Sequence, residues 1–170
     1  DQLGYDIALD PAGNVLLSGK YQGDVSFGGA GLGVGTAGAF VAKLSEDGVH
    51  QWSKAFAGLF TTGRGVAADS AGNVLVTGEF VGPTDFGGGA IASNGADLFV
   101  VKLAPDGSHL WSRKFGDVQG QIGVAVAADP TDHAIVAGHF TGQLDFGVVT
   151  LSANGAINDL DTVFLAKLAP

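Results

Sequence analysis

Short runs of mostly apolar residues recur along the chain and are separated by turns that contain glycine. In the middle of the sequence these runs cover 65–69, 73–80, 98–104 and 108–115, and each has the length of one β-strand. The second and third runs are apolar at nearly every position, whereas a strand with one face in water alternates apolar and polar residues. None of the runs combines helical periodicity with good helix caps. The pattern therefore predicts an all-β chain whose central strands are covered on both faces.

The turns between these runs have the chemistry of tight hairpins. In DSAGN, 69–73, the carboxylate of Asp69 can accept hydrogen bonds from the following backbone amides, and Gly72 can adopt a positive φ. In APDGS, 104–108, an Asp-Gly pair does the same between the third and fourth runs. Two tight hairpins in one unit predict an antiparallel meander of four strands.

The unit is repeated along the chain. A shift of 59 positions carries Asp10 to Asp69, and a further shift of 60 carries Asp69 to Asp129. An insertion of about five residues near NGAINDLDTVF delays the last strand of the third copy. With that insertion allowed for, the following residues also coincide: Gly19, Gly78 and Gly138; Phe27, Phe86 and Phe146; Lys43, Lys102 and Lys167; Trp52 and Trp111. Regular periods in this range indicate arrays, solenoids or propellers.

A four-stranded meander that is buried on both faces and repeated at a nearly constant period predicts a β-propeller segment. The expected blades are approximately 1–58, 59–117 and 118–170, within a single structural unit. The chain stops at KLAP where the middle copy continues into DGSHLWSRKF, so the third blade is expected to lack its outer strand. Propellers close with about four to eight blades. We therefore expect two apolar ends that further blades cover, either from a longer chain or from another copy.

One signature runs through the repeats. It reads D-x-A-G-N-V-x-V-T-G-x-F, then D-F-G-G-G, then D-x-F-V-x-K-L-x-x-D-G-x-x-L-W, and the middle copy carries it at these positions: Asp69, Gly72, Asn73, Gly78, Phe80, Asp85, Phe86, Gly87, Asp97, Phe99, Lys102, Asp106, Gly107 and Trp111. The first copy departs from it at Ser26 and Ala39, and the third at Asp132 and in the insertion. The signature resembles the bacterial β-propeller repeat family called SBBP. The resemblance implies a secreted or cell-envelope bacterial protein, and it assigns no catalytic residue.

Charge and composition exclude several classes of partner. The net charge is −9, from 17 Asp and Glu against 8 Lys and Arg, so the field of the protein repels nucleic acid phosphates. No apolar run approaches the roughly 18 residues of a membrane span, and DQLGYDIALD has neither the basic nor the apolar region of a signal peptide. The chain has no cysteine, which excludes disulfides and thiolate metal sites. We expect no nucleic acid partner and no membrane insertion.

Motifs that resemble catalytic or cofactor sites are explained by the repeat. DFG at 85–87 and 145–147 matches the kinase magnesium motif, but the other kinase motifs are missing and its repetition indicates a turn. Gly31, Gly33 and Gly35 are spaced as in a dinucleotide loop, but no helix follows them. We interpret them as a connection between the second and third strands. The sequence predicts no catalytic residue and no cofactor.

Candidate metal ligands are few. His50 and His109 occupy equivalent places on the outermost strand, where we expect them to be exposed, and no histidine pair has the spacing of a helical zinc site. Asp159 and Asp161 place two carboxylates in the inserted segment INDLDT. A solvated loop is the favoured interpretation of this segment, and a structural calcium site is the alternative. We expect no metal elsewhere.

Aromatic residues and variable loops are the remaining candidates for binding. Trp52 and Trp111 can stack on sugars, but their recurrence after the Asp-Gly hairpin favours docking of the outer strand onto the next blade. The loops at 57–64 and 116–123 differ from each other and precede the innermost strands. We expect them to line one mouth of the propeller channel, where a ligand can bind.

The predicted function is that of a non-enzymatic extracellular interaction scaffold. Stacked blades hold variable loops in fixed positions, which lowers the entropy cost of binding a protein or glycan ligand. A carbohydrate-binding propeller is the first alternative, because repeated shallow sites support avidity. A fragment of a larger propeller enzyme, with its catalytic residues in other blades, is the second.

Overall fold

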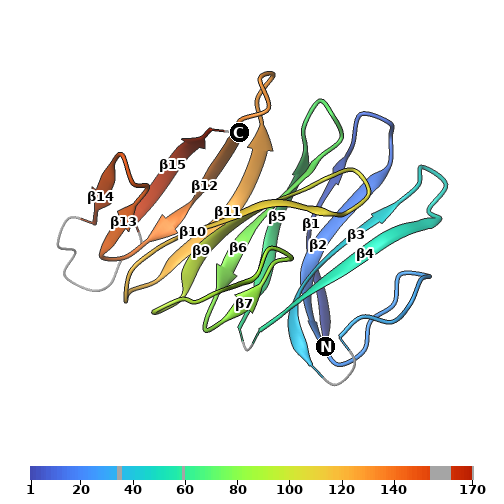
Figure 1. Ribbon diagram of the computed structural model, residues 1–170, viewed down its shortest axis with the longest axis horizontal. Coiled ribbons are helices and arrows are strands. Elements are labelled where there is room, and N and C mark those ends of the chain that lie inside the picture. The colour runs from blue at the N-terminus through green and yellow to red at the C-terminus, as the bar shows by residue number, and fades with distance from the viewer. Residues whose placement is uncertain (34–35, 59, 154–161, 170) are drawn as a thin grey trace.

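The computed structural model describes residues 1–33, 36–58, 60–153 and 162–169, which form strands and turns (Figure 1). The first sheet consists of β1 (Gln2–Leu9), β2 (Val15–Gln22), β3 (Ala37–Leu44) and β4 (His50–Ala57). The second consists of β5 (Thr62–Ala68), β6 (Val74–Phe80), β9 (Asp97–Leu103) and β10 (His109–Phe115). The third consists of β11 (Gln121–Ala128), β12 (Ala134–Phe140) and β15 (Thr162–Leu168). Two short hairpins follow β6 and β12, namely β7 (Thr84–Asp85) with β8 (Ala90–Ile91), and β13 (Gln143–Asp145) with β14 (Thr150–Ser152).

Each main sheet is an antiparallel meander, with the orders β1-β2-β3-β4, β5-β6-β9-β10 and β11-β12-β15. The three sheets follow one another along the long axis of the molecule, and none of them closes on itself within the described residues (Figure 1). The predicted all-β fold of propeller-like blades is confirmed, with three strands in the last described sheet. No helix in the described part of the chain is long and apolar enough to cross a membrane.

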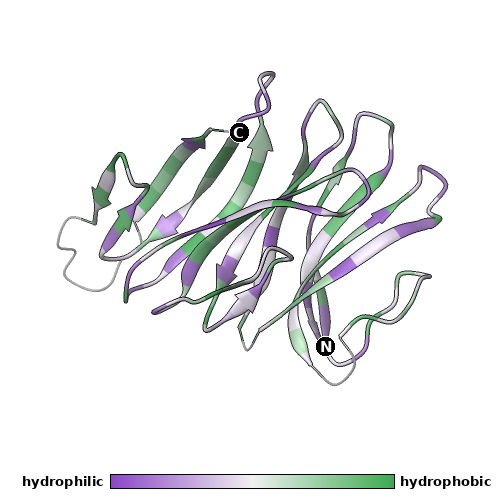
Figure 2. Ribbon diagram, viewed as in Figure 1, coloured by the Kyte–Doolittle hydropathy of each residue, from purple (hydrophilic) through white to green (hydrophobic). Residues whose placement is uncertain are grey.

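Two apolar clusters join the sheets, one on each face of the second sheet. In β6, Val74 and Val76 belong to the cluster shared with the first sheet, whereas Leu75 between them belongs to the cluster shared with the third. Phe99 and Leu98 of β9 divide in the same way. All five side chains are fully buried, and Figure 2 shows hydrophobic residues concentrated along the strands. The continuous apolar runs therefore reflect burial on both faces, as predicted.

A β-bulge interrupts the pairing of the inner strand with the second strand in every sheet. The second strand carries a glycine beside each bulge, at Gly19, Gly78 and Gly138. A Cβ atom on Gly78 would lie 1.8 Å from the carbonyl oxygen of Thr62, and the other two glycines make the same close approach. This contact between backbones explains why glycine recurs in the middle of an apolar strand.

The predicted hairpin turn at Asp69 is confirmed, and it also contains an ion pair that the sequence analysis did not predict. Asp69 Oδ1 accepts hydrogen bonds from the backbone amides of Ala71 (3.0 Å) and Asn73 (2.8 Å). Its Oδ2 lies 2.8 Å from Lys102 Nζ, with the aspartate side chain fully buried and the lysine 8% exposed. Because Lys102 is in β9, this pair ties the first turn of the blade to its third strand.

The same ion pair occurs in the other two repeats with different burial. Asp10 and Lys43 lie 2.8 Å apart, and their side chains are only 3% and 4% exposed. Asp129 pairs with Lys167, whose side chain is 54% exposed. The pair of the third sheet is therefore open to solvent, and we expect it to contribute less to stability than the two buried pairs.

These contacts change the acidity of the carboxyl groups. Burial alone would raise the pKa of Asp10, but hydrogen bonds from Lys43 and Asn14 outweigh it and lower the pKa to about 2. The pKa of Asp69 is lowered by the same balance of burial and hydrogen bonds. The pKa of Asp129 is also lowered, mainly by the hydrogen bond from the lysine of its own repeat. All three carboxylates are therefore ionised at neutral pH.

The third repeat places an aspartate where the other two turns have glycine. Gly13 and Gly72 have φ angles of 82° and 79°, and Asp132 has a φ of 63°. Aspartate is among the few residues that tolerate this left-handed conformation. Its carboxylate accepts hydrogen bonds from the backbone amide (3.1 Å) and hydroxyl (2.8 Å) of Ser70 in the second sheet. The substitution therefore adds a polar link between neighbouring sheets.

The two outer faces of the array expose apolar side chains. In β1, Ile7 and Leu9 are 70% and 66% exposed, and in β15, Val163 and Leu165 are 80% and 72% exposed. Val100, which occupies the position of Leu165 in the second sheet, is fully buried. The two apolar ends expected from the sequence are present.

Candidate functional site

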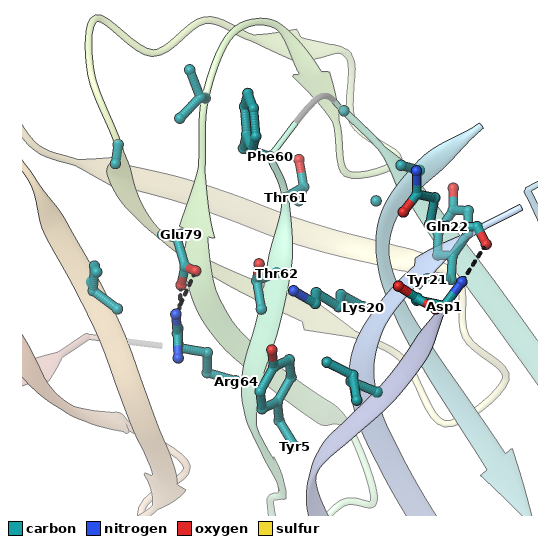
Figure 3. Close-up of a pocket in the computed structure, with 17 residues that line it drawn as sticks. Asp1, Tyr5, Lys20, Tyr21, Gln22, Phe60, Thr61, Thr62, Arg64 and Glu79 are labelled. Atoms are coloured by element: carbon teal, nitrogen blue, oxygen red, sulfur yellow. Dashed lines mark hydrogen bonds and ion pairs between the residues drawn. The ribbon is translucent and has the colours of Figure 1, made fainter.

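A pocket with a volume of about 670 Å³ lies where the first and second sheets meet. Its walls come from the inner strands β1 and β5, from the ends of β2 and β6, and from the loop that precedes β5 (Figure 3). The predicted loop 57–64 lines it with five residues: Gly58, Phe60, Thr61, Thr62 and Arg64. The second predicted loop, 116–123, contributes only Ile122. Both predicted loops thus line one cavity, but loop 57–64 contributes far more of the lining than loop 116–123.

Arg64 and Glu79 form a bidentate ion pair in the wall of the pocket. Arg64 Nε lies 2.5 Å from Glu79 Oε2, and Arg64 Nη2 lies 2.8 Å from Glu79 Oε1. The guanidinium also lies over the ring of Tyr5, 5.6 Å from its centroid. The hydrogen bonds that Arg64 donates to Glu79 raise the pKa of Arg64 above its ordinary value. This pair is a rigid and internally neutralised part of the wall.

Lys20 differs from Arg64 in having no such counter-ion. It is half-buried, and its side chain points into the pocket towards Thr62 (Figure 3). It makes no hydrogen bond or ion pair with any other described residue. Lys20, Glu79 and His139 occupy the same place in the three repeats, so this position changes its charge from one sheet to the next.

Aromatic rings supply the apolar surface of the pocket. Phe60 is 69% exposed and Tyr5 is 41% exposed, and both line the cavity. Tyr21 is 2% exposed, and its hydroxyl lies 3.3 Å from Thr36 Oγ1. A neighbouring hollow of about 710 Å³ shares Gln22, Ala37, Gly58 and Val81 with the pocket. The two hollows therefore adjoin each other at the junction of the sheets.

The equivalent place between the second and third sheets is filled by polar side chains. Gln121 is fully buried; its Nε2 donates to Asp117 Oδ1 (2.7 Å) and to the carbonyl of Thr141 (3.2 Å), and its Oε1 accepts from the Asp117 amide (3.2 Å). Asp97 is also fully buried and pairs with Lys114 at 2.8 Å. The sequence analysis did not predict this network, because its members come from segments far apart in the chain.

The predicted role of the tryptophans in docking the outer strands is confirmed. Trp52 Nε1 in β4 donates a hydrogen bond to the carbonyl of Pro105 in the second sheet at 2.9 Å. Trp111 in β10 packs against the cluster shared with the third sheet, and the Arg113 guanidinium lies 4.9 Å from its ring centroid. Both indoles therefore hold neighbouring sheets together.

The prediction that His50 and His109 are exposed is wrong, because both are half-buried. The ring of His50 lies so close to Gly29 that a Cβ atom there would be 2.3 Å from Cε1, and His109 approaches Gly88 in the same way. Each ring also contacts a serine hydroxyl three residues further on, at 3.1 and 3.2 Å respectively. The glycines that follow Phe27 and Phe86 make room for these imidazoles.

The remaining candidates are turns or lie outside the described residues. Asp85 Oδ1 accepts hydrogen bonds from the amides of Gly87 (2.7 Å) and Gly89 (3.0 Å), so the DFG sequence is a turn, as predicted. Gly35, Asp159 and Asp161 fall in the parts that the structure does not describe. Among the described residues, no group of three or more His, Asp or Glu side chains is placed to hold a metal ion.

Comparison with known proteins is consistent with a repeat protein and identifies no family. No family model matches the chain. Over 157 residues the chain is 27% identical to an uncharacterized WD repeat-containing protein, L264, of Acanthamoeba polyphaga mimivirus; the match covers 79% of this chain and 11% of that protein. The chain thus spans about a ninth of that relative. A crystal structure of a protein of unknown function from Bacteroides caccae is 17% identical with a TM-score of 0.36, and the match covers 90% of this chain and 62% of that one.

Proposed function

We propose that the chain is a protein-interaction scaffold of propeller-like blades, with the pocket between the first and second sheets as its binding surface. The observation that carries this proposal is the contrast between framework and pocket. The framework residues, which are the bulge glycines and the Asp–Lys ion pairs, recur in every repeat. The pocket position of Arg64, in contrast, is held by Tyr5 and Val124 in the other repeats. A single binding site needs such asymmetry, and a purely structural position does not.

The physical basis of binding is a pre-organised surface. The walls are strands of two sheets that an apolar cluster holds together, and Arg64 is fixed by Glu79. A partner therefore meets a cavity whose side chains lose little freedom on association. The name of the mimivirus relative, a WD repeat-containing protein, supports a repeat scaffold of this type.

We propose a binding role and not a catalytic one. Arg64 and Glu79 neutralise each other, and no second carboxylate is paired with Glu79 among the described residues. A fragment of a larger propeller enzyme is the alternative. A panel of hydrolase substrates tests it on a longer parent chain that includes further blades: turnover there would favour the enzyme, and no turnover would weaken that alternative.

The signature that resembles SBBP repeats supports a secreted or cell-envelope location in a bacterium. The open faces of β1 and β15 support further blades, either from a longer chain or from another copy. Light scattering after size exclusion tests this proposal. A stable species at twice 17.0 kDa, about 34 kDa, indicates another copy, and aggregation indicates missing blades of a longer chain. A stable, well-behaved monomer would contradict both.

Selection from a random-peptide phage library tests the binding function. We expect the wild-type chain to enrich peptides, and Phe60→Ser to lose that enrichment, because Phe60 is a 69% exposed ring in the pocket. The matched control is Val49→Ser, a 65% exposed apolar residue in the β3–β4 hairpin. Enrichment that is absent, or that is equal on both variants, would refute the proposal.

Glycan binding at the same pocket is the second candidate, because the exposed rings of Tyr5 and Phe60 offer stacking surfaces for sugars. A glycan array with wild type and Phe60→Ser separates the two functions. Specific glycan signals that disappear in the variant, without peptide enrichment, would favour the lectin.

A further inference from the structure

The pocket contains a lysine, Lys20, that has no ion-pair partner among the described residues. Lys20 is half-buried, and no described carboxylate pairs with it. Asp1 also lines the pocket, but no ion pair joins it to Lys20, and Glu79 is already occupied by Arg64 at two oxygens. A charged side chain that is removed from water without a partner is unfavourable. The site is therefore electrostatically incomplete, and a negatively charged group would complete it.

Two hydroxyl groups lie beside this cation. Figure 3 shows the Tyr5 hydroxyl and the Thr62 side chain on the same side of the pocket as the end of Lys20. Neither hydroxyl makes a hydrogen bond with a described residue. An ammonium group with two free hydroxyl donors matches the two oxygens of a carboxylate, which accept several hydrogen bonds at once.

The size of the cavity favours a segment of protein over a free small anion. The pocket of about 670 Å³ continues into the hollow of about 710 Å³ along the sheet junction, which is far more than one carboxylate fills. The exposed rings of Phe60 and Tyr5 offer apolar contact next to the cation. An extended peptide can place an acidic side chain on Lys20 and an apolar neighbour on these rings.

Building on the proposed function, we infer that the partner is a protein segment that inserts a carboxylate next to Lys20, Tyr5 and Thr62. The overall charge of −9 repels an acidic partner at long range, so the attraction has to come from this contact. Salt at physiological strength screens charges beyond about 8 Å and weakens that repulsion more than the buried contact. We therefore expect binding to persist at physiological ionic strength.

The composition of the selected peptides tests this inference. Wild type is expected to enrich peptides rich in Asp and Glu, and Lys20→Met and Lys20→Glu are each expected to weaken binding of the enriched peptides by about tenfold or more. Lys54→Glu is the matched control, because Lys54 is also half-buried and lies outside the pocket. Its binding should match that of the wild type.

The outcomes separate the inference from the proposed function. Two outcomes would overturn the inferred carboxylate contact and leave the scaffold function intact. In one, the enriched peptides need Phe60 but are neutral or basic; in the other, they bind Lys20→Met as well as they bind the wild type. Loss of binding in Lys54→Glu as well would also overturn it, because net charge alone would then explain the effect. Absence of any enrichment that depends on Phe60 would refute the scaffold function itself.

Discussion

The junction between the first and second sheets is hollow, whereas the equivalent junction between the second and third sheets is filled. Both are built on the same inner-strand bulges, and an apolar cluster closes each of them. They differ mainly at three repeat positions, where the first junction has Gly38, Gly58 and Thr61 and the second has Asp97, Asp117 and Gln121. Small residues leave a cavity, and larger polar residues close it with a hydrogen-bond network.

This difference shows how a repeat can separate stability from binding. The backbone framework is kept by glycines, Asp–Lys ion pairs and apolar strands that recur in each copy. A few positions at the start of the inner strand then decide whether the junction carries a pocket or a polar core. The following experiments, from the largest expected effect to the smallest, test that division.

Acid should break the Asp–Lys ion pairs of all three sheets. A carboxyl whose pKa is lower in the folded state gives stability that is present above its unfolded pKa and is lost as the pH falls through the folded value. The pKa of Asp10 is lowered to about 2, and those of Asp69 and Asp129 are also lowered. The urea midpoint, followed by tryptophan fluorescence, should be constant above about pH 5 and should fall steeply between about pH 4 and pH 2. A constant midpoint down to pH 2 would contradict this assignment.

Gly78→Ala should damage the bulge that positions the pocket. The new methyl group would lie 1.8 Å from the Thr62 carbonyl oxygen, so the strands must separate. We expect the free energy of unfolding to fall by about 3 kcal/mol. Gly31→Ala is the control, because no atom lies within 4 Å of its Cβ position. Equal stability of the two variants in urea titrations would show that the close approach is not required.

Gln121→Thr should open the filled junction, because threonine is the residue at this place in the hollow one. The change removes the amide that bonds Asp117 and leaves buried polar groups without partners. The expected cost is about 2 kcal/mol in the free energy of unfolding. Gln51→Thr, an exposed exchange of the same residue types, should change it by less than about 0.5 kcal/mol. If the two variants cost the same, the network does not stabilise this junction.

Thr61→Gln is the reverse exchange and should close the hollow junction. The longer side chain reaches into the pocket, so we expect peptide binding to fall by about tenfold while stability changes by less than about 1 kcal/mol. Titration of an enriched peptide and urea unfolding of the same sample measure both quantities. Unchanged affinity would place the binding surface elsewhere.

The fold could be predicted from the sequence because its signals are local and repeated. Apolar residues at nearly every position of 73–80 and 98–104 require burial on both faces, and the turn at Asp69 is readable within five residues. The pairing of Asp69 with Lys102 was not predicted, although both recur in every repeat. Their recurrence alone does not distinguish a buried ion pair from two separate solvent-exposed groups.

The pocket was only partly predictable. Loop 57–64 could be placed at the inner strand from its position before β5. Lys20 and Glu79 were not singled out, because they lie inside strands, where the sequence does not show which side chains meet across sheets. The available signal was the change from lysine to glutamate to histidine at one repeat position. The exposure of His50 was predicted wrongly, because the glycines that make room for its ring are distant in the chain.

Burial of both faces of β9 also removes the usual determinant of strand register. A one-residue slip normally turns apolar side chains to water, but in this strand Leu98, Phe99 and Val100 would only exchange two apolar surroundings. Lys102 is an exception, since a slip would carry its ammonium group away from Asp69 and leave a buried charge unpaired. The ion pair therefore specifies the register of β9. It selects one strand pairing among several that hydrophobic burial alone would make nearly equal in stability.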